Sequence, residues 1–229
     1  MIVTINMDKA VMNTQTRGFF ITIEGPEGAG KSTLAQAIEK HLQKSGKKCL
    51  RTREPGGTPL AEQLRDVLKR HKGEEKLHTA TELLLMEAAR VQHVEEVIRP
   101  ALDSGVCVIC DRFYDSTSAY QGGARGVEAG VIEYLNNYAV SGCHPDLTIL
   151  LDLPVESGFA RTAKREQTCG KFDRFEQENI EFHRNVRAAF LKLAEKNSSR
   201  IKVVDALRTR EEIAHDVEIL IDECLFKVQ

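Results

Sequence analysis

The segment Gly25-Pro26-Glu27-Gly28-Ala29-Gly30-Lys31-Ser32 follows the pattern G-x-x-x-x-G-K-[ST] and decides the fold of this chain. The apolar stretch before it, Phe19 to Ile23, indicates a buried strand. The stretch after it, Thr33 to Leu42, carries apolar residues at helical spacing and predicts an amphipathic helix. A glycine-rich turn between a strand and a helix lets backbone amides surround a phosphate group. The sequence therefore predicts a nucleoside triphosphate site.

Within this segment, the Lys31 ammonium group can reach the β- and γ-phosphates, and the Ser32 hydroxyl can bind Mg²⁺. The alternative is a glycine-rich turn that binds nothing, and the flanking strand and helix argue against it. We predict that the triphosphate contacts Gly25, Pro26, Glu27, Gly28, Ala29, Gly30, Lys31, Ser32 and Thr33.

The 229 residues of the chain suit one α/β domain, at most with an inserted lid. Its 32 Lys and Arg residues balance 34 Asp and Glu residues, which argues against binding to a nucleic acid polymer or a membrane. No apolar run approaches the length of a membrane span, and residues 1–17 lack the apolar core of a secretory signal. We expect a cytoplasmic protein in which residues 1–17 are a disordered leader or follow an early start codon.

The six cysteines are scattered along the chain, which indicates a reducing compartment. Cys107 and Cys110 form a C-x-x-C pattern, but both lie in the strand-like run Val106–Cys110. Side chains three residues apart on a strand point to opposite faces, so these two cannot bind one metal ion. We predict that they pack in the core.

Strand-like and helical patterns alternate along the chain. The strand-like runs are Phe19–Glu24, Lys48–Thr52, Val106–Asp111, Leu147–Asp152 and Ile201–Asp205. The helical patterns are Ser32–Ser45, Pro59–Arg70, Ala80–Leu102, Gly130–Val140, Val155–Lys164, Ile180–Lys196 and Thr209–Cys224. This alternation predicts an α/β fold of the three-layer P-loop NTPase kind, with a five-stranded parallel sheet and helices on both faces. A single domain is expected over residues 18–229.

Ligands of such folds bind beyond the carboxyl ends of the strands. This rule selects the phosphate-binding segment, the segment Arg53–Gly57 and the pair Asp111-Arg112. Asp111 is the best acidic partner for Mg²⁺, directly or through water. Asp152 ends the next strand in a similar way, and we expect it to be structural.

Arg53, Arg90 and Arg112 are three arginines that lie at strand ends or within an apolar helix. A buried guanidinium is costly unless it is paired, and its planar fork suits phosphate. Each one alone could be a salt-bridged arginine. Together they predict a second anionic pocket that faces the triphosphate and binds a phosphorylated acceptor.

A second basic cluster consists of Arg161, Lys164, Arg165, Lys171 and Arg174. Arg161 and Arg165 are four residues apart and share one helix face. The following Glu166–Gly170 has little apolar content and is expected to be a loop. We predict a lid over about residues 154–176 that brings arginines over the transferring phosphoryl group. The alternative is a solvated basic helix face.

The predicted helix Ala80–Leu102 is apolar nearly all round in its first half. Such a helix needs a second packing partner. The partner is either another helix of the same fold or a second copy of the chain. We expect a homodimer through residues 80–100.

Several ordered motifs resemble the thymidylate kinase family, which comprises P-loop nucleoside monophosphate kinases that phosphorylate dTMP with ATP. They cover the chain from about Gly18 to its C-terminus. The motifs are Ile23–Ser32, Thr52–Thr58, Ala88-Ala89-Arg90, Asp111–Gly122, Pro145–Thr148 and Phe172–Glu176. The resemblance implies transfer of the γ-phosphoryl group of ATP to dTMP, giving dTDP and ADP for the supply of dTTP, with Mg²⁺ as cofactor.

The resemblance also implies the acceptor site. Arg53 and Arg112 would hold the dTMP phosphate, and Glu27 would reach toward the acceptor. Arg90 and Gln121 would contact the thymine, because a guanidinium donates to a carbonyl and an amide both donates and accepts.

The walls of the acceptor site follow in the same way. Ser116 and Thr117 would line the pocket, and Met86 would pack near the base, where some relatives have an aromatic residue. Tyr120 would crowd the sugar 2′ position and favour deoxyribose.

The catalytic residues implied by the resemblance are Lys31, Asp111, Arg112 and Arg165. Glu27 in the P-loop together with a lid arginine matches the bacterial arrangement. Arg165 is the best match for the catalytic lid arginine and Arg161 the second, with Arg161 also counted among the ATP-binding residues. Residues Gln167–Gly170 look like an insertion relative to the family pattern.

Two other functions remain open from the sequence. One is a kinase for another nucleoside monophosphate. The other is a P-loop binding module or switch that hydrolyses nucleotide slowly. The absence of an Asn-Lys-x-Asp guanine motif and the two basic clusters argue against the switch.

Overall fold

The computed structural model describes residues 17–70, 75–169 and 174–227. Five strands form one parallel sheet in the order β2-β3-β1-β4-β5. They are β1 (Phe20–Glu24), β2 (Cys49–Arg53), β3 (Cys107–Asp111), β4 (Leu147–Asp152) and β5 (Ile201–Asp205). The predicted five-stranded parallel sheet is therefore confirmed, with each strand close to its expected position.

The helices in the described ranges follow the predicted order, with additions between β3 and β4. They are α1 (Lys31–Lys44), α2 (Pro59–Arg70), α3 (Thr79–His93), α4 (Arg99–Asp103), α5 (Tyr114–Thr117), α6 (Ala129–Val140), α7 (Val155–Cys169), α8 (Ile180–Lys196) and α9 (Arg210–Lys227). Two π-helical turns, Val94–Ile98 and Ser118–Ala124, complete the set.

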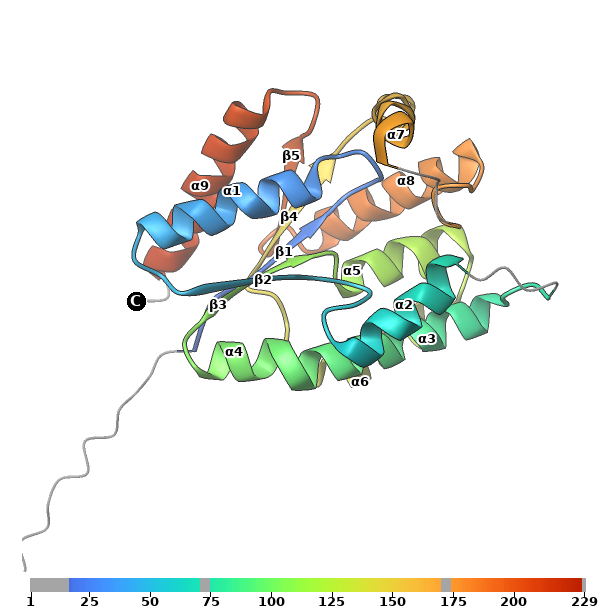
Figure 1. The fold of residues 1–229 in the computed structure, drawn as a ribbon, viewed down its shortest axis with the longest axis horizontal. Helices are drawn as coiled ribbons and strands as arrows, with labels where there is room; N and C mark the ends of the chain where they lie inside the picture. The colour runs from blue at the N-terminus through green and yellow to red at the C-terminus, as the bar shows by residue number, and fades with distance from the viewer. Residues whose placement is uncertain (1–16, 71–74, 170–173, 228–229) are drawn as a thin grey trace, which may run out of the picture.

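Helices cover both faces of the sheet (Figure 1). One face packs against α1 and α9 through a core that includes Ile21, Leu34 and Val217. The opposite face packs against α4, α6 and the turn Val94–Ile98 below β1 and β3, and against α8 below β4 and β5. Apolar residues therefore alternate between two cores along each central strand, as a sheet buried on both faces requires.

The two cysteines of the C-x-x-C pattern lie in different cores. Cys107 packs in the cluster under α1 and α9, and Cys110 packs in the cluster under α4. The prediction that they point to opposite faces of the sheet is confirmed.

The predicted helix Ala80–Leu102 consists of α3, the π-helical turn Val94–Ile98 and α4. The turn is continuous with both helices, which explains why the apolar pattern runs through all three. Its side chains Val94 and Ile98 are fully buried against the sheet. The sequence pattern alone does not indicate this local change of helix type.

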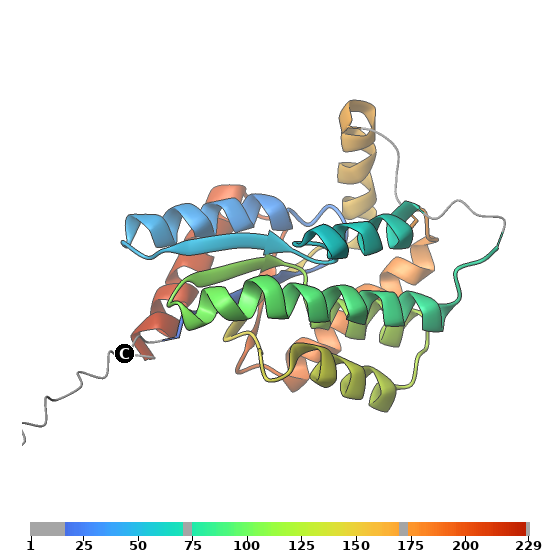
Figure 2. The ribbon, with the colours of Figure 1, turned by 60° about the horizontal axis from the view of Figure 1, so that its bottom comes forward.

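The loop predicted at Glu166–Gly170 is wrong for Glu166 to Cys169, because α7 continues through them. Residues 164–169 contain no Gly or Pro, and Lys, Arg, Glu and Gln favour helix. The side chains of 164–169, including Arg165, lie outside the described residues. Helix α7 projects away from the sheet (Figure 2).

Polar contacts hold the start of the described chain and the start of α9. Arg17 Nη1 pairs with Asp146 Oδ2 at 2.9 Å, whereas residues 1–16 of the predicted leader lie outside the described ranges. At the start of α9, Thr209 accepts from the Glu212 amide and donates to its carboxylate, which is a capping box. In the ranges 17–70, 75–169 and 174–227, no helix has the length and apolar character that a membrane span requires.

We predict that Phe20→Ala lowers the free energy of unfolding by about 3–5 kcal/mol, because it opens a cavity in the core under α4. Phe20 is 0% exposed and packs edge to face against Phe113 at 5.1 Å between ring centroids. Urea unfolding followed by circular dichroism measures the loss. Leu207→Ala is the control, since Leu207 is 55% exposed and should change the free energy by less than about 0.5 kcal/mol. Equal losses in both variants would contradict the assigned core.

Candidate functional site

A cleft of ≈ 1720 Å³ lies at the carboxyl ends of the strands. Its walls come from the P-loop (Gly25–Ser32), the ends of β2 and β3, the turn after β3, the base of α7 and the loop after β5. A single ligand usually fills about 300–1,000 Å³. The volume is therefore large enough for two nucleotides.

Nearly all predicted site residues line this cleft. They are Glu27, Gly28, Ala29, Gly30, Lys31, Ser32, Thr33, Arg53, Met86, Arg90, Asp111, Arg112, Ser116, Thr117, Tyr120, Gln121 and Arg161. Gly25 and Pro26 lie behind the wall, although their carbonyl oxygens contact Lys31. The predicted catalytic residue Arg165 lies on α7, but its side chain is outside the described residues.

The P-loop adopts backbone conformations that only glycine accepts readily. Gly25, Gly28 and Gly30 have φ angles of 139°, 75° and 96°. Lys31 Nζ donates to the carbonyl oxygens of Gly25 at 3.1 Å and Pro26 at 2.8 Å. Burial and the neighbouring Arg112 lower the pKa of Lys31 to about 8. The loop thus holds the Lys31 amine at the first turn of α1.

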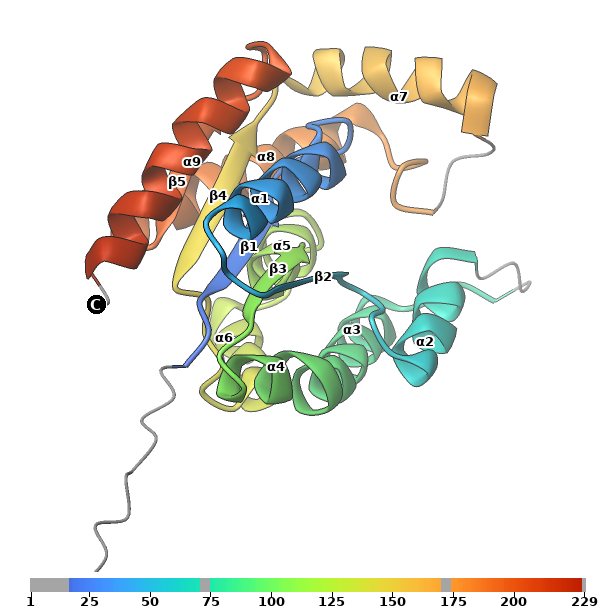
Figure 3. The same cartoon turned by 60° about the vertical axis from the view of Figure 1, so that its left-hand side comes forward.

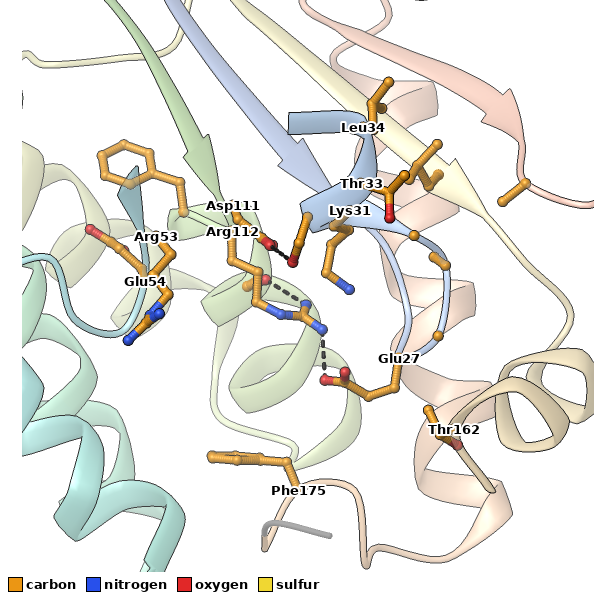
Figure 4. Close-up of a pocket in the computed structure, with 18 of the residues that line it drawn as sticks. Glu27, Lys31, Thr33, Leu34, Arg53, Glu54, Asp111, Arg112, Thr162 and Phe175 are labelled. Atoms are coloured by element: carbon orange, nitrogen blue, oxygen red, sulfur yellow. Dashed lines mark hydrogen bonds and ion pairs between the residues drawn. The ribbon is translucent and has the colours of Figure 1, made fainter. Parts of the chain in front are cut away.

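Ser32 and Asp111, the two predicted metal ligands, lie side by side. Ser32 Oγ donates to Asp111 Oδ2 at 2.7 Å (Figure 4). Parallel pairing places Ile23 opposite Asp111, so the start of the P-loop and the end of β3 are level. No group of three His, Cys, Asp or Glu side chains in the described ranges could hold a metal by itself. A metal here would therefore need oxygen ligands from phosphate and water as well.

Arg112 lies at the centre of the cleft, with a left-handed backbone (φ 71°) that turns its side chain toward the P-loop. Its Nη1 donates to Ser116 Oγ at 3.1 Å. Its Nη2 donates to Glu27 Oε1 at 2.7 Å and to the Tyr120 hydroxyl at 3.1 Å. A left-handed backbone is strained for an arginine, and residues strained in this way cluster at functional sites.

Glu24, which the sequence analysis did not select, is linked to Arg112 through Ser116, which accepts from Arg112 and donates to Glu24. Its carboxylate is fully buried and accepts from Phe113 N at 2.8 Å, Ser116 N at 3.2 Å and Ser116 Oγ at 2.6 Å. Burial and the charge of Asp115 raise the pKa of Glu24 to about 7. An acidic residue that ends a buried strand is the sequence signal that could have found it.

Arg90 is 2% exposed and lies in a polar network. Its Nε donates to Glu54 at 2.8 Å, and its Nη1 donates to Glu87 at 2.6 Å and to Asn136 at 3.3 Å. Nη2 donates to Thr117 at 3.0 Å, and the second N–H of Nη2 has no partner in the described part of the chain. Arg90 therefore retains one donor for a ligand.

The remaining predicted acceptor residues form the rest of this half of the cleft. Gln121 is 1% exposed and donates from Nε2 to Glu82 Oε1 at 2.7 Å. Tyr120 is held edge to face by Phe175 and Phe182, with ring centroids 6.0 Å apart in both cases. Met86 packs against the same apolar cluster.

Arg53 ends β2 next to Asp111 of β3. Its Nη2 donates to Glu62 of α2 at 3.0 and 3.1 Å, and its side chain is 54% exposed. Arg53 is thus less constrained than Arg112, although both line the cleft.

The base of α7 touches the P-loop through two glycines. A Cβ atom at Gly28 would lie 2.7 Å from the Gly158 oxygen, and a Cβ at Gly158 would lie 2.6 Å from the Glu27 oxygen. Arg161 Nη2 donates to the Ala206 oxygen at 2.9 Å and Nη1 to the Gly28 oxygen at 3.5 Å. Arg161 therefore joins the P-loop to the loop after β5.

One further part of the wall was missed from the sequence. Residues Ala206 and Arg208–Glu211 follow β5 and line the cleft. The rule of the carboxyl strand ends would have selected them if it had been applied to the fifth strand. Arg174, which the sequence analysis assigned to the lid cluster, lines the other side of the cleft, and its Nε donates to the Leu68 oxygen of α2 at 2.9 Å.

Comparisons with known proteins agree with this geometry. The sequence model of the family described as "Thymidylate kinase" matches residues 23–217. A thymidylate kinase of Pseudomonas putida (strain GB-1) is 48% identical over 204 residues, which cover 89% of this chain and 95% of that protein. A thymidylate kinase of Pseudomonas fluorescens (strain Pf0-1) is 49% identical over 208 residues, which cover 91% of this chain and 97% of that protein. The crystal structure of a thymidylate kinase from Ehrlichia chaffeensis aligns with a TM-score of 0.70 and 31% sequence identity. The alignment covers 89% of this chain and 99% of that one.

We predict a pH-dependent stability contribution from Glu24. Its pKa rises from 4.5 to about 7 on folding, so the protonated form stabilises the native state fully below pH 4.5. This contribution is lost as the pH rises through 7, and at about 1.4 kcal/mol per pKa unit it amounts to the order of 3 kcal/mol. Urea unfolding from pH 4 to 8 measures it as the difference between the wild type and Glu24→Gln. This difference should fall with rising pH, and a constant difference would refute the assignment.

Proposed function

The chain belongs to the thymidylate kinase family, and from this membership and the geometry of the cleft we propose that it transfers the γ-phosphoryl group of ATP to dTMP, giving dTDP and ADP. The product would enter the supply of dTTP for DNA synthesis. The observation that carries the proposal is one cleft with two groups of anion-binding side chains. The P-loop with Lys31 forms one group, and Arg112 with Arg53 forms the other.

Phosphoryl transfer requires alignment and charge neutralisation more than covalent chemistry. The P-loop amides and Lys31 would hold the β- and γ-phosphates of ATP. Arg112 would hold the dTMP phosphate, whose oxygen attacks the γ-phosphorus in line. No general base is needed, because the acceptor phosphate is largely ionised near neutral pH. The second guanidinium, Arg53, would reduce the repulsion between the two anions.

The lid helix α7 would supply the remaining positive charge. It carries Arg161, which already contacts the P-loop, and Arg165 one helical turn further along. We propose Arg165 as the catalytic lid arginine and Arg161 as a contact for ATP. An arginine in this role contributes about 10³–10⁵ in rate.

The residues present fit a magnesium ion. Ser32 Oγ and Asp111 Oδ2 are hard oxygen atoms at the edge of the triphosphate site, and they are close enough to hydrogen-bond to each other. Ser32 and Asp111 would hold the ion directly or through water. When bound, it would neutralise charge on the β- and γ-phosphate oxygens.

We predict that a coupled ADP-release assay shows clear preference for dTMP over CMP and AMP, with dUMP included in the panel.

Lys31→Ala should lower kcat by at least about 100-fold, since it removes a donor aimed at the developing charge. Lys44→Ala on the same helix is the control and should retain wild-type turnover, because Lys44 lies at the distal end of α1. A preference for AMP, or near-normal turnover of folded Lys31→Ala, would reject the proposal.

We also propose that the protein is a homodimer through α3 and α6. These helices pack side by side and expose apolar side chains at helical spacing. The exposed set is Leu84 and Val91 on α3, and Val131, Tyr134 and Tyr138 on α6. Tyr134 and Tyr138 are 69% and 72% exposed, which is unusual for large side chains on one face. Within the chain, α3 packs against both α2 and α6, and in our proposal a second copy covers the apolar side chains that α3 and α6 leave exposed.

We predict that light scattering at micromolar concentration gives twice the 25.6 kDa of one chain. Tyr134→Glu combined with Tyr138→Glu should shift the mass to that of one chain, because two charges would be buried without partners. Ile219→Glu is the control, since Ile219 is 46% exposed on α9, on the other face of the sheet. A monomeric wild type would end the proposal.

We place the protein in the cytoplasm. The described cysteines, Cys49, Cys107, Cys110, Cys143 and Cys224, are free thiols, as a reducing compartment would keep them.

A further inference from the structure

Glu82 of α3 is a buried carboxylate that collects polar side chains from three parts of the chain. It is 1% exposed. It accepts from Gln121 Nε2 at 2.7 Å and from Arg125 Nε and Nη2, each at 3.2 Å. Arg174 Nη2 lies 2.6 Å from its second oxygen. The sequence analysis gave Glu82 no role, and it does not line the cleft.

The contact with Glu82 fixes the orientation of the Gln121 amide. A carboxylate only accepts hydrogen bonds, so the amide nitrogen must face Glu82. The reversed orientation would bring two oxygen acceptors to the 2.7 Å now spanned by the hydrogen bond. The Gln121 carbonyl oxygen is therefore on the other branch of the amide, and no donor from the described residues contacts it. Because Gln121 lines the cleft, this oxygen is available to a ligand.

A fixed acceptor selects among pyrimidine bases. Thymine and uracil carry a donor, N3–H, on the edge that pairs with other bases, whereas cytosine carries a lone pair at N3. A carbonyl oxygen opposite N3 attracts the first two and repels the third. Arg90 adds a second discrimination between the bases. Its remaining N–H can donate to the carbonyl at C4 of thymine or uracil, but not to the amino group that cytosine has there.

We propose that Glu82 is a positioning residue that sets base specificity by locking Gln121 with its carbonyl oxygen toward the acceptor nucleotide. The inference rests on the proposed function and extends it by one residue. Glu82 also pairs with Arg125 and Arg174, and these two guanidinium groups compensate its buried charge. Without the Glu82 carboxylate the Gln121 amide would be free to rotate. The cleft would then bind bases that carry either a donor or an acceptor at N3.

The test compares kcat/KM for dTMP and dCMP in the wild type and in Glu82→Gln. The variant keeps the shape of residue 82, but its own amide can donate as well as accept, so both orientations of Gln121 become satisfied. The dTMP/dCMP ratio should fall by about tenfold or more, because a correctly placed acceptor discriminates strongly against a ligand that cannot donate. An unchanged ratio would overturn the proposal.

Arg125→Met is the matched control. It removes one cation from the same carboxylate without touching Gln121, and Arg125 does not line the cleft. The ratio should stay within about twofold of the wild type, although the melting temperature of both variants should fall, since each loses a buried ion pair. If Arg125→Met lowers the ratio as much as Glu82→Gln, the effect is general loosening and the role of Glu82 is rejected.

A measurement on the wild type keeps the inference testable if Glu82→Gln does not fold. Nuclear magnetic resonance of the Gln121 side chain should show a shift of its carbonyl carbon on addition of dTMP, while its amide protons stay protected from exchange. Loss of that protection in the complex would contradict the locked orientation. A wild type that does not phosphorylate dTMP at all would instead refute the proposed function, and the two failures are thereby distinguished.

Discussion

The parallel pairing of β1 with β3 is the constraint on which the site depends. It places Ile23 opposite Asp111, and the Arg112 amide continues the ladder by donating to the Ile23 oxygen at 2.9 Å. The P-loop leaves one strand and the Arg112 turn leaves its neighbour at the same level. Adjacent parallel strands are about 4.8 Å apart, so the two segments start from points one strand spacing apart. Two phosphate sites that must react in line are therefore built on neighbouring strands, where the sheet fixes their separation.

A layer of buried carboxylates supports the side chains that face the cleft. Glu24 holds Ser116 and the turn that carries Arg112, Glu54 holds Arg90, and Glu82 holds Gln121. Burying a carboxylate is costly unless donors surround it, and each of these three has at least two. A hydrophobic residue in the same place could pack as well, but it could not fix the rotation of a guanidinium or an amide. The buried carboxylates therefore fix the orientation of the guanidinium and amide groups, and they do so at a cost in the free energy of unfolding. This is expected at a site whose specificity depends on donors and acceptors.

The sequence determined the sheet and most of the cleft wall, because both follow from short-range patterns and one topological rule. Apolar runs of five or six residues mark the strands, and the carboxyl ends of parallel strands meet at one edge. Arg53, Asp111 and the P-loop were found in this way, whereas Met86, Tyr120 and Gln121 needed the family resemblance. The segment that carries Tyr120 and Gln121, Tyr114 to Ala124, is helical in the structure although it is rich in Ser, Thr and Gly. Packing of Tyr120 against α8 overrides these weak local preferences, and no local pattern indicates that.

The carboxylate layer was missed for a related reason. Glu82 and Glu54 lie on segments where a charged residue is usually exposed, so their sequence positions suggest solvent rather than burial. Only the assembled fold shows that Arg125 and Arg174, which are 43 and 92 positions from Glu82, converge on it. The same holds for the contact of Gly28 with Gly158, which joins α7 to the P-loop. Because neither backbone can move apart from the other without losing this close packing, the base of α7 belongs to the fixed part of the site. Adjustment of the lid arginines to bound nucleotide would then have to occur in the part of α7 that projects beyond that contact (Figure 3).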